Sequence, residues 1–110
     1  MLNTRIEYRP VKQVEYDGEW YDAFNVARGI FEILDDVDCG EDSSWSDGLR
    51  MDDIDLPLKL IKAFVANGLL SSSPGERMST RYRIAEGKRE TLRDMAREMY
   101  DFCMNRPTRI

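Results

Sequence analysis

Residues 55–70 read Asp55-Leu-Pro-Leu-Lys-Leu-Ile-Lys-Ala-Phe-Val-Ala-Asn-Gly-Leu-Leu70, and this stretch decides the fold. Pro57 suits the first turn of a helix, where its missing N–H is harmless, and Asp55 before it is a candidate cap. Asn67 and Gly68 supply a left-handed stop. The pattern predicts a helix that starts near Pro57, ends at Gly68 and leads directly into a strand.

The two faces of this helix differ in chemistry. Its inward face is predicted to consist of Ile61, Phe64 and Val65. The residues expected to point elsewhere are Lys59, Lys62, Ala63 and Ala66. The helix is therefore expected to pack by one side and to present two lysines to solvent.

A second strand and a long helix are expected after this stretch. Leu69 and Leu70 begin a strand, residues 71–79 form a loop, and residues 80–84 alternate as the return strand. From about residue 86 to 104, apolar residues recur at helical spacing. They are Leu92, Met95, Ala96, Met99, Phe102 and Cys103. This end of the chain thus predicts an antiparallel strand pair followed by an amphipathic helix.

The N-terminal part predicts strands and one more helix. Apolar and polar residues alternate over residues 5–21, and Asp17-Gly18 is typical of a two-residue hairpin turn. An apolar stripe then predicts a helix over residues 22–36, which Asp22 or Asn25 would cap. Gly29 inside it indicates close packing against another element. Trp20 and Tyr21 are expected to anchor the hairpin to this helix.

Residues 35–48 form an acidic segment that is expected to be a solvated loop, with a short helix after it over residues 46–53. Asp36 and Asp38 have the spacing of the first two ligands of an EF-hand. Gly40 stands at the third ligand position, and Glu41 stands where that loop requires glycine. A calcium site is rejected on that mismatch.

Composition indicates one folded domain. The chain has 110 residues, of which 42% are hydrophobic, and no stretch approaches the roughly 20 apolar residues that cross a bilayer. Cys39 and Cys103 are far apart, in no metal-binding pattern, and are expected to be reduced thiols. A cytoplasmic protein without membrane contact is the resulting expectation.

Most catalytic chemistry is disfavoured by the residues present. With no histidine, the chain cannot assemble a Ser-His-Asp or Cys-His pair. It also contains no phosphate-binding glycine motif and no nucleophile elbow. We therefore expect a protein that is not an enzyme and that needs no cofactor or metal.

Charge is divided unevenly along the chain. The net charge is −5, yet residues 1–57 carry 5 basic and 15 acidic residues, whereas residues 58–110 carry 11 basic and 6 acidic ones. Because binding to phosphates depends on the field within about 10 Å, the basic half is where nucleic-acid contacts are expected.

Two motifs carry a resemblance to the winged helix-turn-helix superfamily. Phe64-Val-Ala-Asn-Gly-Leu-Leu70 looks like the end of a recognition helix that turns into the first wing strand, and Tyr82-Arg-Ile-Ala-Glu-Gly-Lys88 is similar to the exit from the wing into the last helix. In the second motif Ala85 replaces the usual threonine, and Gly87 comes one residue early. The resemblance covers about residues 22–104.

The fold that the resemblance implies is α+β, a winged helix-turn-helix with an added N-terminal β-hairpin and a long C-terminal amphipathic helix. It makes residues 1–110 a single domain, with β segments in residues 1–21, the winged-helix core in residues 22–104 and a tail in residues 105–110.

The function that the resemblance implies is that of a small transcription regulator that binds double-stranded DNA as a homodimer. The C-terminal amphipathic helix is the expected contact between subunits, and the N-terminal β segments are a further candidate. Carried over by position, the DNA-binding residues are Lys59 and Lys62 on the recognition helix and Arg77, Arg81 and Arg83 on the wing. The three arginines are equally explained as charges that keep an edge strand soluble.

The alternative is that the winged helix is a protein-interaction adaptor or inhibitor, of the kind that a phage or mobile element could encode. Its contact surface would then be the acidic segment over residues 35–55, with Asp42, Trp45 and Asp47 as the candidate contacts. Acidity and exposed tryptophan favour this alternative, and the scaffold itself is compatible with both functions.

Overall fold

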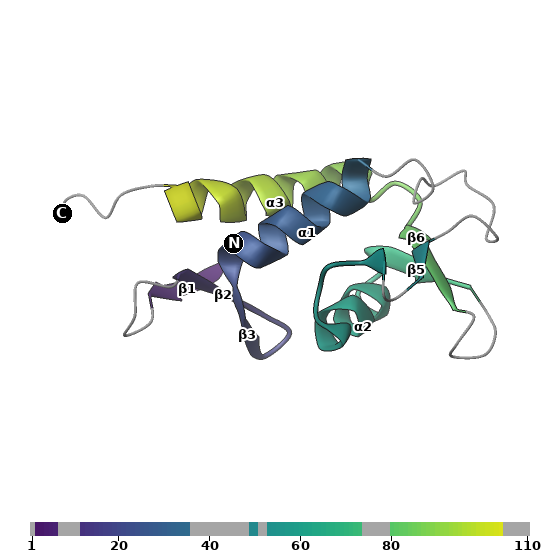
Figure 1. Ribbon diagram of the computed structural model, residues 1–110, viewed down its shortest axis with the longest axis horizontal. Coiled ribbons are helices and arrows are strands. Elements are labelled where there is room, and N and C mark those ends of the chain that lie inside the picture. Colours follow the sequence, from purple (N-terminus) through teal and green to yellow (C-terminus); the bar gives the residue numbers. More distant parts are fainter. Residues whose placement is uncertain (1, 7–11, 36–48, 51–52, 74–79, 105–110) are drawn as a thin grey trace.

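The chain folds as a mixed α+β protein with two small antiparallel sheets, as Figure 1 shows. The computed structural model describes residues 2–6, 12–35, 49–50, 53–73 and 80–104. Several predicted features lie outside these residues. They are the acidic loop over residues 36–48, the loop over residues 74–79 and the tail over residues 105–110.

The first sheet has the order β1-β2-β3, with strands Asn3–Ile6, Lys12–Tyr16 and Glu19–Asp22. Asp17 and Gly18 both have positive φ, 54° and 85°, so they close the predicted two-residue hairpin between β2 and β3. The sequence predicted this hairpin. It did not predict that β1 pairs with β2 to make a three-stranded sheet.

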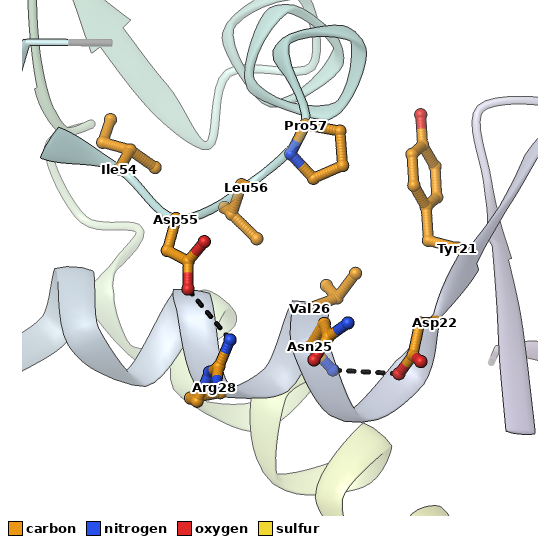
Figure 2. A pocket seen from close by; sticks show the side chains of 9 residues that line it. All are labelled: Tyr21, Asp22, Asn25, Val26, Arg28, Ile54, Asp55, Leu56 and Pro57. Carbon is orange, nitrogen blue, oxygen red and sulfur yellow. Dashed lines mark hydrogen bonds and ion pairs between the residues drawn. The ribbon is translucent and has the colours of Figure 1, made fainter. Parts of the chain in front are cut away.

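The helix α1, Ala23–Asp35, starts as predicted with Asp22 as its cap, because Asp22 Oδ1 accepts a hydrogen bond of 3.1 Å from the backbone N–H of Asn25 (Figure 2). The last helix, α3, spans Arg89–Met104 and runs antiparallel to α1 along the top of Figure 1. Its predicted stripe packs against the core: Leu92, Ala96 and Met99 are buried.

The short helix α2 spans Leu58–Ala66 and ends in a Schellman turn. Gly68 has φ +77°, its N–H donates to the carbonyl of Val65, and the Leu69 N–H donates to that of Phe64. The predicted stop at Asn67-Gly68 is thereby confirmed. The prediction that Asp55 caps this helix is wrong, because the Asp55 carboxylate binds Arg28 instead. Pro57 is the N-cap residue, without a side-chain hydrogen bond.

The second sheet has the order β4-β6-β5, with strands Leu49–Arg50, Arg81–Ile84 and Leu70–Ser72. The helix predicted over residues 46–53 is wrong at residues 49–50, because these pair with Tyr82 and Arg81 as β4. The strand β6 is consequently the central one. The explanation of Arg81 and Arg83 as protection of a sheet edge is therefore wrong.

One core joins the helices and both sheets. Val14 of β2, Ile30 of α1, Phe64 of α2, Ile84 of β6 and Leu92 of α3 belong to the same buried cluster. Tyr16 adds an edge-to-face contact with Phe64 at a centroid distance of 5.1 Å. Because Phe64 of α2 is fully buried in this cluster, packing in the core fixes the orientation of α2.

Gly29 allows α1 to approach the segment that enters α2. A Cβ atom at position 29 would lie 2.5 Å from Leu56 Cδ2 and 2.7 Å from the carbonyl oxygen of Asp55. The second of these is a backbone atom and cannot rotate away. The close packing that the sequence indicated at Gly29 is confirmed, and its partner is the connection from β4 to α2.

We predict that Gly29→Ala lowers the free energy of unfolding by about 1–3 kcal/mol, the usual cost of overpacking. Alanine in an unobstructed helix would instead raise stability by about 0.5–1 kcal/mol. Urea denaturation followed by circular dichroism measures the difference. Glu32→Ala, at an exposed position of the same helix, is the control. A stabilised Gly29→Ala variant would contradict the close contact with residues 55–56.

Candidate nucleic-acid interface

The outward face of α2 carries the two lysines that the sequence assigned to DNA. Lys59 and Lys62 are both exposed, while Leu60, Ile61 and Phe64 on the other side are buried. This division follows from helical spacing, since residues three apart share a face. Ala63 was expected to point away from the core but is only 7% exposed.

Lys59 forms an ion pair with the first sheet. Lys59 Nζ lies 3.5 Å from Glu19 Oε1 at the start of β3, so the first sheet reaches the beginning of α2. The two side chains are 72% and 53% exposed. A pair this open to solvent contributes about 0–1 kcal/mol and is weakened by salt. The pairing therefore leaves Lys59 able to exchange Glu19 for another anion.

The hairpin of the first sheet also contacts the end of α2. The pKa of Tyr16 is raised, mainly because burial disfavours the phenolate, and a hydrogen bond with the Asn67 side chain partly offsets this. The Asn67 amide in turn donates to the carbonyl of Ala63 at 2.8 Å. The hairpin thus contacts α2 at both ends, through Glu19 at the start and Tyr16 at the end.

Arg81 and Arg83, which the resemblance assigned to a wing, lie on the central strand of the second sheet. In β6 the side chains of Tyr82 and Ile84 are buried, and Arg81 and Arg83, between them in sequence, are half-buried. Since side chains alternate across a strand, both arginines occupy the face turned away from the core. Ser73 binds the backbone of Arg81 twice. The Ser73 N–H donates to the Arg81 carbonyl at 2.9 Å, and the Ser73 hydroxyl accepts from the Arg81 N–H at 2.9 Å.

The structure therefore places four of the five predicted DNA-binding residues on α2 and the second sheet. They form two separate groups. The lysines lie on the helix, and Arg81 and Arg83 lie on the outer face of the sheet. Arg77 and the alternative contacts Asp42, Trp45 and Asp47 lie outside the described residues.

Two residues form ion pairs at this surface that no sequence pattern predicted. Glu19 was seen only as part of a strand, yet it is the partner of Lys59 across 40 residues of sequence. Arg28 was not singled out at all, although it forms an ion pair of 2.9 Å with Asp55 just before α2. No local pattern marks such pairs, because each depends on how two distant segments meet.

Within the described residues, no three histidine, cysteine or acidic side chains are grouped so as to hold a metal ion. None of the helices described has the length and hydropathy that a bilayer span requires. No family model, curated protein or solved structure matches the chain.

We predict that the ion pair between Lys59 and Glu19 contributes less than about 1 kcal/mol to stability. A double-mutant cycle with Lys59→Met and Glu19→Gln, measured by urea denaturation at low and high salt, gives the coupling energy. It should be small and should fall as salt rises. A coupling that is large and independent of salt would mean that the pair is a structural clamp.

Proposed function

We propose that this protein is a winged-helix DNA-binding protein, a small cytoplasmic transcription regulator in which α2 is the recognition helix and β5 and β6 are the wing. The single observation that carries the proposal is the exposed pair Lys59 and Lys62 on a helix that runs through a Schellman turn directly into an antiparallel strand pair. The sheet order adds support, since β4, which precedes α2 in sequence, pairs with β6.

The dimensions of α2 suit this role. With its side chains an α-helix is about 10–12 Å in diameter, which fits a major groove about 12 Å wide, and the nine residues of α2 give about 13 Å of helix along the groove. Lys59 and Lys62 would neutralise phosphates or reach guanine acceptors, and Arg81 and Arg83 would follow the backbone from the wing. In this proposal, recognition is led by charge, because the remaining exposed residues of the helix offer few donors for base edges.

A homodimer belongs to the same proposal. The apolar stripe of α3, which was expected to pair, is occupied by packing inside the monomer. Tyr100 and Met104 remain 42% and 52% exposed, one helical turn apart. Tyr100 already makes an edge contact with Phe31 at 6.3 Å, so a partner would extend an aromatic cluster that exists. We propose this part of α3 as the contact between subunits.

We predict that Lys59→Ala and Lys62→Ala each weaken binding to a fluorescent DNA duplex and reduce the log–log salt slope by close to one. Glu19→Gln should have the opposite effect on affinity, because it removes a carboxylate 3.5 Å from Lys59. Fluorescence anisotropy over a salt series measures both quantities.

The control for that experiment is Arg97→Ala, which removes an exposed cation from α3. Its slope should equal that of the parent protein. Absence of duplex binding at low ionic strength, or lysine variants that bind like Arg97→Ala, would overturn the proposal.

A second candidate, the protein-interaction adaptor, is favoured by the carboxylates around α2. Glu19 lies beside its first turn, and Asp53 and Asp55 are exposed in the segment that enters it. Leu58 is 42% exposed at the same end. An apolar residue within an acidic surround is suited to a basic protein surface.

If this second candidate is correct, Asp42→Lys combined with Asp47→Lys should abolish capture of a co-purifying host protein, while Lys59→Ala leaves it intact. Affinity purification followed by mass spectrometry measures the loss. Capture that survives the charge reversal would remove the acidic segment as the contact surface.

A further inference from the structure

A cleft lies where the end of β3 and the first turns of α1 meet the segment that leads into α2. Its volume is about 400 Å³, within the range of small-molecule sites. In Figure 2, Tyr21 lies on one side, Leu56 and Pro57 lie on the other, and Val26 of α1 lies between them. The proposed DNA contacts use none of these residues.

Two facing parts of the cleft wall present apolar rings. Tyr21 presents an aromatic ring, and Pro57 presents a rigid ring from the opposite segment. Val26 is only 2% exposed, so it closes the core beneath the cleft. Gly29 leaves the space in which Leu56 packs against α1, so this wall is part of the close contact between the two segments. Such walls favour a flat apolar group of the ligand.

The polar groups of the cleft carry an excess of negative charge. Asp22 and Asp55 both line it, and Arg28 is the one cation among the described lining residues. Asp22 uses one oxygen to cap α1. Asp55 uses one oxygen to bind Arg28, at 2.9 Å. Each carboxylate therefore keeps an oxygen that can accept a hydrogen bond from a ligand.

The remaining groups fit the same kind of ligand. The side chains of Arg28 and Asp55 are 51% and 61% exposed, so their ion pair is weak and can rearrange at the mouth of the cleft. Burial raises the pKa of Tyr21, and the nearby Glu19 and Asp17 add to this, so its hydroxyl stays protonated at neutral pH. A cationic ligand thus finds a carboxylate on either side of the cleft, Asp22 at the end of β3 or Asp55 before α2.

We propose that this cleft binds a small organic cation with a flat apolar group, of the aryl amidine or aryl amine class. The flat group lies between Tyr21 and Pro57, and the cationic group donates to Asp22 or to Asp55. The walls supply contact area, and the carboxylates supply charge-assisted hydrogen bonds and thereby the preference for cations. This site is independent of whether α2 binds DNA.

The test uses benzamidine as the probe, with benzoate and benzyl alcohol as anionic and neutral probes of similar shape. Each is titrated into the full-length, isotope-labelled protein while backbone amide NMR signals are followed. Benzamidine should give saturable shifts at residues 21–28 and 54–57, whereas the other two probes should bind at least about tenfold more weakly.

Two conservative variants test the roles of the carboxylates. Asp22→Asn keeps a good helix cap and removes the charge, and Asp55→Asn removes the other charge at an exposed position. At least one of the two should weaken benzamidine binding about tenfold. The matched control is Asp94→Asn on the exposed face of α3, which should bind like the parent protein.

Three results would overturn the inference. They are the absence of saturable benzamidine shifts in the folded parent protein, equal binding of benzoate, and unchanged affinity in both the Asp22→Asn and Asp55→Asn variants. Circular dichroism of each variant verifies that it is folded before titration, so that weakened binding reports the lost charge and not a lost structure.

Discussion

The close contact between α1 and the segment at residues 55–56 is the constraint on which the placement of α2 depends. Gly29 provides the space, and no residue with a Cβ atom fits there without a shift of backbone. From this point the chain enters α2, reverses at Gly68 and begins the second sheet. The surface that carries the lysines and the cleft beside it therefore arise from a single close approach of two segments.

The pair α1 and α3 provides the rigid support for this arrangement, and its helix ends are satisfied by distant cations. Neither helix has a basic residue in its last turn. Arg89 donates to the carbonyl of Leu34 at 2.9 Å, and Lys12 donates to that of Phe102 at 2.9 Å. Both contacts complement the negative end of a helix dipole. Arg89 and Lys12 therefore have structural roles, and their charges are not available to a nucleic acid.

The sequence predicted those parts of the fold that are determined locally. Asp17-Gly18, Asn67-Gly68 and the stripe of α3 each depend on a few neighbouring residues, and each was found as expected. The strand β4 was mistaken for a helix, because two residues have no period and their conformation comes from pairing with β6. Asp55 had two possible partners, the N–H groups of α2 and Arg28, and only the fold decides between them. The cleft could not be predicted, since its walls come from separate segments.

Electrostatics around α2 limit how strongly this surface can attract phosphate. A chain of net charge −5 repels a polyanion at long range, so attraction must come from within about a Debye length of the helix. There, Glu19 partly neutralises Lys59, while Lys62 lies further along the same face. Because the ion pair is open to solvent, a phosphate in the proposed complex would replace the carboxylate without leaving a buried charge unpaired. In the proposed function, the hairpin of the first sheet would therefore tune the affinity of α2 for phosphate, and the same hairpin contacts the helix core through Tyr16 and Phe64.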